Sequence, residues 1–194
     1  MEIEKNLHNY IKIYEKVMPK NQLEVLKKIC KNEKKFEEGK IIKTDGTHEV
    51  EKNIRKTNFK SLFNIGNESL TDVHWANYLN FIFGNGITDY YNFLNLSRDF
   101  RVLDIQILKY TKGSHYKFHI DHAATSPRTL SCIFLINDDY EGGDLVFRYP
   151  ITNKEVKIPK KENTLIIWPS NFLYPHSVMP VESGERYSVV SWTL

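Results

Sequence analysis

The sequence has few cysteines and no long apolar run. Only Cys30 and Cys132 occur among its 194 residues, too few for the disulfide framework of a small secreted protein. No apolar stretch approaches the roughly 18 residues that span a bilayer. The first residues, Met-Glu-Ile-Glu-Lys-Asn, are too charged for a secretory signal. We therefore expect a cytoplasmic protein with two free thiols and no membrane contact.

Internal repeats and low-complexity segments are also missing. Hydrophobic residues make up 41% of the chain and charged residues 26%, which is typical of a folded globular protein. Aromatic residues, at 13%, are numerous enough to fill a substantial core. At this length the default is one domain, spanning residues 1–194.

A strongly one-signed charge is absent. The net charge is +3, and residues 1–60 hold 15 basic and 10 acidic side chains. In residues 27–38 the lysines alternate with glutamates, a pattern typical of a solvated helix face. Nucleic acid is therefore not favoured as a partner.

The first half of the chain predicts mostly helical support. Tyr10–Tyr14 alternates like a short strand, and helical spacing follows Pro19. Ser69 is a candidate N-cap for a long helix, which Gly84-Asn85-Gly86 is expected to interrupt. Between these helices, residues 36–60 are polar and contain the turn signal Asp45-Gly46. They predict a hairpin or a mobile loop.

The second half predicts a β-roll. Short alternating or apolar runs are separated by glycine, proline and asparagine, at residues 101–110, 115–122, 129–137, 144–149, 163–168 and 186–193. Strands of this length and spacing favour a sandwich or a jelly roll. The expected fold is mainly β with supporting helices: a double-stranded β-helix (jelly roll) core at residues 100–194, packed on a helical layer with a lid loop at residues 1–99.

His119-Ile120-Asp121 is the first candidate site. On a strand, residues two apart point to the same face, so this imidazole and carboxylate could bind one metal ion. A single His-x-Asp triplet is common by chance and proves little without its surroundings.

Those surroundings contain several spaced motifs. Upstream lies Tyr110-x-x-Gly113-x-x-Tyr116-x-x-His119-x-Asp121. Downstream come Arg128, the pair Gly142-Gly143, and His176 followed ten residues later by Arg186. Together these motifs resemble the iron(II)/2-oxoglutarate-dependent dioxygenases of the prolyl 4-hydroxylase type, strongly over residues 100–194 and more weakly over the rest of the chain.

The resemblance implies a set of cofactors and the residues that hold them. His119, Asp121 and His176 would bind Fe(II), since two histidines and one carboxylate leave positions open for oxygen chemistry. Arg186 would grip the far carboxylate of 2-oxoglutarate through its planar guanidinium, and Tyr110 would donate a hydroxyl to the same carboxylate. Dioxygen would be the second co-substrate, with ascorbate as a candidate reductant.

The resemblance also implies substrate-binding residues at the mouth of the roll. Tyr116, Arg128 and Trp192 match by motif position, and Arg55 matches an Ile-Arg element in a loop that closes over peptides. Aromatic rings suit a proline ring. Tyr116 and Trp192 are equally consistent with sheet core, and Arg128 with a structural salt bridge. The lid at residues 43–60 is equally consistent with a disordered hairpin.

The implied function is hydroxylation of a prolyl residue in a protein or peptide, with 2-oxoglutarate converted to succinate and CO₂. Three alternatives remain: hydroxylation of a free amino acid or other small molecule with the same cofactors, demethylation of nucleic acid, and a non-catalytic cupin-like binding module. Oxygenases that repair alkylated bases carry a second arginine shortly after the one that binds 2-oxoglutarate, and none follows Arg186 here. A cupin-like module would leave the spacing of Arg186 unexplained.

Overall fold

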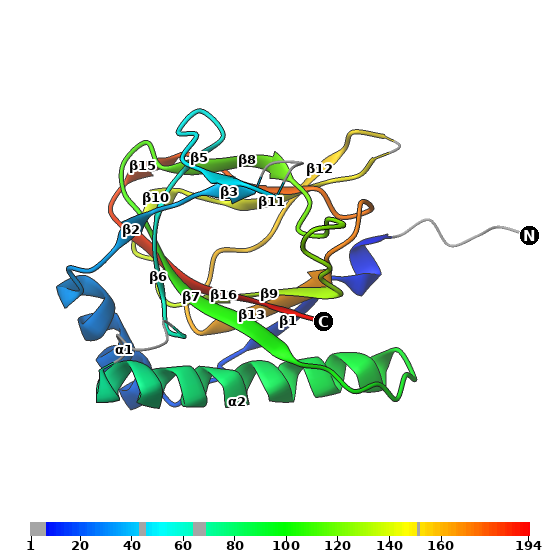
Figure 1. Ribbon diagram of the computed structural model, residues 1–194, viewed down its shortest axis with the longest axis horizontal. Helices are drawn as coiled ribbons and strands as arrows, with labels where there is room; N and C mark the ends of the chain where they lie inside the picture. Colours follow the sequence, from blue (N-terminus) through cyan, green and yellow to red (C-terminus); the bar gives the residue numbers. More distant parts are fainter. Residues whose placement is uncertain (1–6, 43–45, 64–68, 151) are drawn as a thin grey trace, which may run out of the picture.

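Two antiparallel sheets face one another above a layer of two helices (Figure 1). The computed structural model describes residues 7–42, 46–63, 69–150 and 152–194. The helices are the short η1 (Leu7–Tyr10), α1 (Lys20–Asn32) and α2 (Leu70–Phe93). The strands are β1 (Lys12–Glu15), β2 (Glu37–Glu38), β3 (Ile41–Ile42), β4 (His48–Glu49), β5 (Arg55–Lys56), β6 (Asn58–Ser61), β7 (Val102–Tyr110), β8 (His115–His119), β9 (Leu130–Leu135), β10 (Glu141–Gly142), β11 (Leu145–Arg148), β12 (Glu155–Lys157), β13 (Thr164–Pro169), β14 (His176–Val178), β15 (Val181–Ser183) and β16 (Arg186–Thr193).

The larger sheet has seven strands in the order β1-β13-β9-β16-β7-β6-β2, and the smaller has five in the order β12-β11-β14-β8-β5. Two short pairs, β10–β15 and β3–β4, complete the strands. Many strands that neighbour in space are distant in sequence, such as β9 and β16 or β8 and β14, as expected when two sheets are wound together. The predicted mainly β fold with a jelly-roll core is confirmed.

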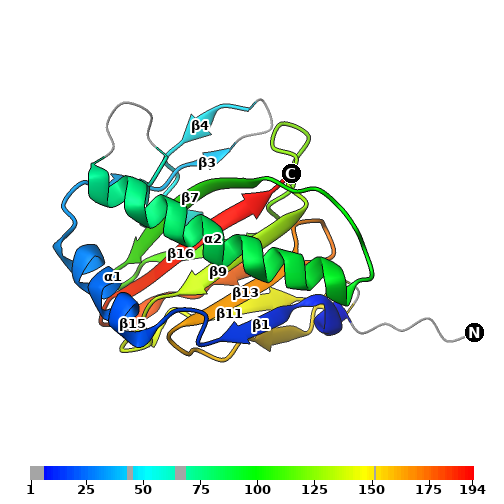
Figure 2. The same ribbon diagram turned by 90° about the horizontal axis from the view of Figure 1, so that it is seen from below.

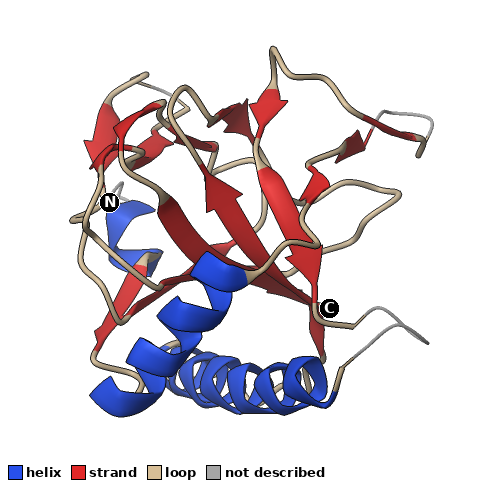
Figure 3. Ribbon diagram, turned by 90° about the vertical axis from the view of Figure 1, so that its left-hand side faces the viewer, coloured by secondary structure: helices blue, strands red, loops and turns tan. Residues whose placement is uncertain are grey.

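The helices pack on the outer face of the seven-stranded sheet. Figure 2 shows α2 crossing β7, β16, β9 and β13, and Figure 3 shows both helices on the same side of the strands. The buried faces of α1 and α2 share one apolar cluster with that sheet, including Leu26, Leu79 and Ile107. The helical layer therefore holds the sheet rigid from behind and leaves its inner face free.

The long helix begins where the sequence predicts, but it is not interrupted. Ser69 caps α2, because its hydroxyl accepts from the Asp72 backbone while the Asp72 carboxylate accepts from the Ser69 backbone. The predicted break at Gly84-Asn85-Gly86 is wrong, since α2 runs through it. A Cβ on Gly86 would lie 2.6 Å from Leu165. Gly86 therefore lets the helix approach the sheet closely, a packing role that outweighs its low helix propensity.

The first half of the chain is more than a helical layer. It supplies β1, β2 and β6 to the seven-stranded sheet and β5 to the five-stranded one. The predicted short strand at Tyr10–Tyr14 is present as β1, whereas β2, β5 and β6 were not individually predicted. The predicted hairpin within residues 36–60 is present as the β3–β4 pair, and Asp45 of its turn signal lies outside the described residues.

No helix in the described part of the chain is both long and apolar enough to cross a bilayer. A cytoplasmic location stays a prediction of the sequence.

Candidate metal and co-substrate site

Three side chains from two distant segments of the sequence meet between the two sheets. His119 is the last residue of β8, and His176 is the first residue of β14, directly opposite it in the antiparallel register. Asp121 lies just beyond the end of β8, rather than on the strand as predicted. The ligand atoms of the three residues lie within 4.8 Å of one another. Sheet pairing therefore assembles the predicted metal-binding set.

Both imidazoles are oriented by backbone carbonyls. His119 Nδ1 lies 2.8 Å from the Lys117 carbonyl oxygen, and His176 Nδ1 lies 3.1 Å from that of Tyr174. A carbonyl only accepts, so each Nδ1 carries the proton and each Nε2 keeps its lone pair. These Nε2 atoms lie 3.6 and 3.4 Å from Asp121 oxygens. Such fixed tautomers are typical of metal-ligating histidines, so the residues fit a divalent metal.

Neighbouring side chains hold the three ligands in place. The Ser131 hydroxyl donates to Asp121 at 2.7 Å and lies 2.7 Å from the Ser170 hydroxyl. The Tyr116 ring stacks on His119 with 3.6 Å between centroids, and Trp168 packs edge-on against His176 at 4.9 Å. The donor set is therefore preorganised by contacts that do not themselves bind metal.

The ionisation states also suit a metal. Burial alone would raise the pKa of Asp121, but His176, His119 and the Ser131 hydroxyl outweigh it and hold that pKa well below its ordinary value. Burial, with a smaller effect of His119, lowers the pKa of His176 to about 4. Near neutral pH the site therefore offers an ionised carboxylate and a neutral imidazole, the forms that bind metal.

Arg186 is a buried cation without an anion. Arg186 is the first residue of β16 and lies opposite Tyr110 of β7. It is buried, with only 1% of the residue exposed. The Nη1 group donates to Ser188 at 2.8 Å, whereas Nε and Nη2 have no hydrogen-bond partner among the described residues. An unpaired buried guanidinium is costly. Its free donors therefore fit a carboxylate from a bound molecule, as 2-oxoglutarate would supply.

Tyrosines flank this guanidinium. Arg186 lies over the face of the Tyr110 ring, 5.0 Å from its centroid. Burial raises the pKa of Tyr140, and the nearby Arg186 opposes that shift. Sequence reasoning missed Tyr140, although it stands just before the Gly142-Gly143 turn. That turn is close to the arginine, because a Cβ on Gly143 would lie 3.1 Å from Arg186 Cδ.

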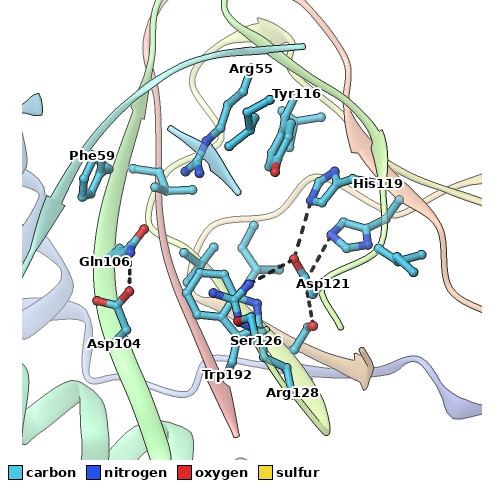
Figure 4. Close-up of a pocket in the computed structure, with 18 of the residues that line it drawn as sticks. Arg55, Phe59, Asp104, Gln106, Tyr116, His119, Asp121, Ser126, Arg128 and Trp192 are labelled. Atoms are coloured by element: carbon cyan, nitrogen blue, oxygen red, sulfur yellow. Dashed lines mark hydrogen bonds and ion pairs between the residues drawn. The ribbon is translucent and has the colours of Figure 1, made fainter. Parts of the chain in front are cut away.

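A cavity of about 540 Å³ opens between the sheets (Figure 4). All the predicted site residues except Arg186 line it: Arg55, Tyr110, Tyr116, His119, Asp121, Arg128, His176 and Trp192. Arg186 is fully buried beside the lining residue Tyr110. The structure thus brings together every residue that the sequence singled out, from both halves of the chain.

The predicted mouth residues touch one another as well as the cavity. The Arg55 guanidinium lies 4.9 Å from the Tyr116 ring centroid, and that of Arg128 lies 3.7 Å from the Trp192 ring centroid. Arg128 also lies 3.8 Å from Asp121, so the anticipated salt bridge exists alongside its place on the wall. Tyr116 and Trp192 line the cavity, and both also pack in the interior: Trp192 is only 8% exposed, and Tyr116 packs against the cluster that contains Leu108 and Tyr110.

Sequence reasoning missed one wall of the cavity. Asp104, Gln106, Leu108 and Tyr110, alternate residues of β7, all line it. The Asp104 carboxylate accepts from Ser61 at 3.1 Å and from Gln106 at 2.5 Å (Figure 4). The sequence did contain a signal for this wall. Residues two apart on a strand point to the same face, so counting back from Tyr110 in steps of two identifies the residues of this face.

Comparison with known proteins shows which family this part of the chain resembles. The family model "2OG-Fe(II) oxygenase superfamily" matches residues 105–194. The matched residues include His119, Asp121, His176 and Arg186, so this part of the chain is similar to 2OG-Fe(II) oxygenases. The resemblance to oxygenases of the prolyl 4-hydroxylase type is thereby confirmed, as are the cofactors of the family: Fe(II), 2-oxoglutarate and O₂.

Curated relatives match over the same part of the chain. A PKHD-type hydroxylase of Synechococcus sp. (strain CC9902) is 35% identical over 96 residues, which is 47% of this chain and 41% of the relative. Another from Prochlorococcus marinus (strain MIT 9215) is 38% identical over 96 residues, 47% of this chain and 42% of the relative. This chain therefore spans less than half the length of these relatives.

Solved structures share the fold over almost the whole chain. A prolyl hydroxylase from Trichoplax adhaerens, in complex with a hypoxia inducible factor peptide fragment, superposes with a TM-score of 0.77 at 20% identity, covering 97% of this chain and 86% of that one. A Pseudomonas putida prolyl-4-hydroxylase gives 0.67 at 21% identity, covering 96% and 94%. The N-terminal helices and strands of this chain therefore belong to the same fold as the matched residues 105–194.

Proposed function

We propose that the chain hydroxylates a prolyl residue in a protein or peptide. The observation that carries this proposal is a preorganised His-Asp-His set lining a cavity, with the buried Arg186 guanidinium, two of whose donor groups are free among the described residues, next to the lining residue Tyr110. Overall, one oxygen atom of O₂ enters a substrate C–H bond, while the other enters 2-oxoglutarate as it loses CO₂ and becomes succinate. Bound Fe(II) would supply the oxygen-activating chemistry.

The protein's own residues have positioning roles. His119, Asp121 and His176 hold the metal, and the Ser131 hydroxyl fixes the carboxylate of Asp121. Arg186 orients the co-substrate through its far carboxylate, with Tyr110 beside it. The sheets around the cavity exclude bulk water from the reacting groups. We assign these residues as the catalytic and cofactor-binding set.

A prolyl substrate is supported by the aromatic mouth. Tyr116 and Trp192 present flat apolar rings with few rotatable bonds, which suit a proline ring. Arg55 and Arg128 complete the proposed substrate-binding set, each packed on one of those rings. Two structural neighbours are prolyl hydroxylases, one of them in complex with a peptide fragment.

We further propose that residues 1–194 act as one domain, with residues 1–99 as support and lid and residues 100–194 as the β-roll. Strands from the first half pair with strands of the second in both large sheets. Neither half could therefore bury its sheet edges alone.

The test supplies the purified protein with Fe(II), 2-oxoglutarate, ascorbate and proline-containing peptides from a cell extract. We expect succinate release and a mass gain of one oxygen atom on a proline. His119→Ala should abolish both, whereas His74→Ala, an exposed histidine on α2, should not. Turnover stimulated by free proline and not by any peptide would overturn the proposal in favour of a small-molecule substrate.

A further inference from the structure

Charges of opposite sign line different walls of the cavity mouth. Lys40, His48 and Arg55 come from the lid segment, defined here as residues 37–56, and all three line the cavity. Asp104 comes from β7, in the seven-stranded sheet. Figure 4 shows Arg55 and Asp104 on different sides of the opening. A substrate entering the mouth therefore meets a cationic side and an anionic side.

The Arg55 side chain is held in place by its neighbours. Its Nη1 donates to the Lys40 carbonyl oxygen at 2.8 Å, and its guanidinium packs on the Tyr116 ring. A Cβ on Gly39 would lie 2.9 Å from Arg55 Nε. The missing side chain of Gly39 thus leaves the space that the guanidinium occupies. An arginine fixed in this way loses little entropy when it binds an anion.

Arg55 and Lys40 differ from nearby lysines in having no counter-ion among the described residues. No carboxylate of these residues lies within ion-pair distance of either, whereas Lys52 is paired with Glu38 and Lys60 with Glu33. Arg128 differs from Arg55, because Asp121 lies close to it. The Arg55 and Lys40 charges are therefore available to a ligand.

Asp104 makes the two sides of the cavity mouth electrostatically different. Its carboxylate is oriented by Ser61 and Gln106, which are both neutral donors. Its backbone has φ of 41°, a left-handed conformation that is costly for a residue other than glycine. Arg128, a cation that also lines the cavity, interacts with the carboxylates of Asp121 and Asp104, so an anionic group of a ligand is drawn instead to Arg55 and Lys40.

We propose that the peptide substrate carries an acidic residue, aspartate or glutamate, at a fixed offset from the target proline, and that Arg55 and Lys40 bind its carboxylate. The inference rests on the proposed function, since it assumes a peptide that crosses the mouth. A carboxylate is the chemistry that an oriented guanidinium recognises best. This ion pair also fixes the direction in which the peptide crosses the mouth, because the acidic residue must lie on the side of the lid segment.

The test measures binding separately from turnover. The full chain, immobilised and loaded with Mn(II) and 2-oxoglutarate, selects from a library of peptides in which one fixed proline is flanked by randomised positions. Retained peptides are sequenced by mass spectrometry. The wild type should enrich Asp and Glu at one offset about threefold to fivefold over the input, the value of one partly exposed charge pair.

Substitutions that change the charge of Arg55 and of Lys56, its neighbour on β5, provide the matched comparison. Arg55→Gln should remove the acidic preference, and Arg55→Glu should replace it with a preference for Lys and Arg. Lys56→Glu makes the same change at the adjacent exposed position, which does not line the cavity, and should leave the acidic preference intact. Thermal unfolding confirms that each variant is folded.

Two results would overturn the inference: a wild type without acidic enrichment, or the same enrichment in Arg55→Glu. Supplying Fe(II) and O₂ to the retained peptides then separates the two proposals. Hydroxylated prolines without an acidic preference reject only the acidic docking site. An Arg55-dependent acidic preference without hydroxylation rejects only the prolyl hydroxylase function.

Discussion

The inner and outer parts of the cavity hold their charged groups differently. Inside, Asp121 and Arg186 sit on or beside paired strands, shielded from water and oriented by Ser131 and Ser188. At the mouth, Arg55 and Arg128 rest on aromatic rings and are more exposed. Charge–charge interactions strengthen as water is excluded. Changes inside should therefore cost far more than changes at the mouth.

The largest effect is expected from Asp121→Ala. It removes the only carboxylate of the metal set, and two neutral imidazoles bind a dication poorly. We expect turnover to fall about a thousandfold or more, with loss of stoichiometric Co(II) binding in a spectroscopic titration. Asp99→Ala, at an exposed position, is the control. Retention of tight Co(II) binding by Asp121→Ala would refute the assigned ligand set.

Arg186→Gln should come next. The change removes the charge and the forked donors while keeping a polar side chain, so the affinity for 2-oxoglutarate should fall about 100-fold, and about tenfold in Arg186→Lys. Calorimetry with Mn(II)-loaded protein measures both dissociation constants. Arg148→Gln, a surface arginine paired with Glu155, should change neither. Unaltered affinity in Arg186→Lys would show that the fork geometry is not used.

Ser131→Ala tests the support of the metal ligands. Asp121 loses the hydroxyl that donates to it, and metal affinity should drop about tenfold, as for other residues that orient a ligand. Co(II) titration gives the affinity, and thermal unfolding checks that the fold is kept. Ser183→Ala on β15 is the matched control. An unchanged Co(II) affinity in Ser131→Ala would mean that sheet pairing alone positions Asp121.

The smallest effect is expected from Arg128→Gln at the mouth. The loss of its contact with Trp192 should raise KM for the peptide about fivefold, with little change in kcat or in KM for 2-oxoglutarate. Steady-state kinetics separate these constants, with Arg101→Gln as the exposed control. A fall in kcat larger than the rise in peptide KM would place Arg128 with the inner group, through its proximity to Asp121.

Much of the inner group could be found from sequence because its residues stand in the ordered motifs by which the chain resembles 2-oxoglutarate-dependent dioxygenases. His119 and Asp121, two residues apart, and Arg186, ten residues after His176, are such motif positions. The wall of the mouth has no comparable motif. Asp104 and Gln106 share the parity of Tyr110 on β7, but nothing in the local sequence marks that face, or Phe59, as part of a cavity.

By itself, the sequence determined which chemistry is possible: the ligand types, the arginine, the strand-rich second half and the start of the long helix at Ser69. Tertiary structure decided three further features. It paired His176 with His119, kept α2 continuous through Gly86 by packing it against Leu165, and brought strands of the first half into both sheets. Local patterns act over a few residues, whereas these features depend on contacts between segments distant in the chain, whose energies no local pattern contains.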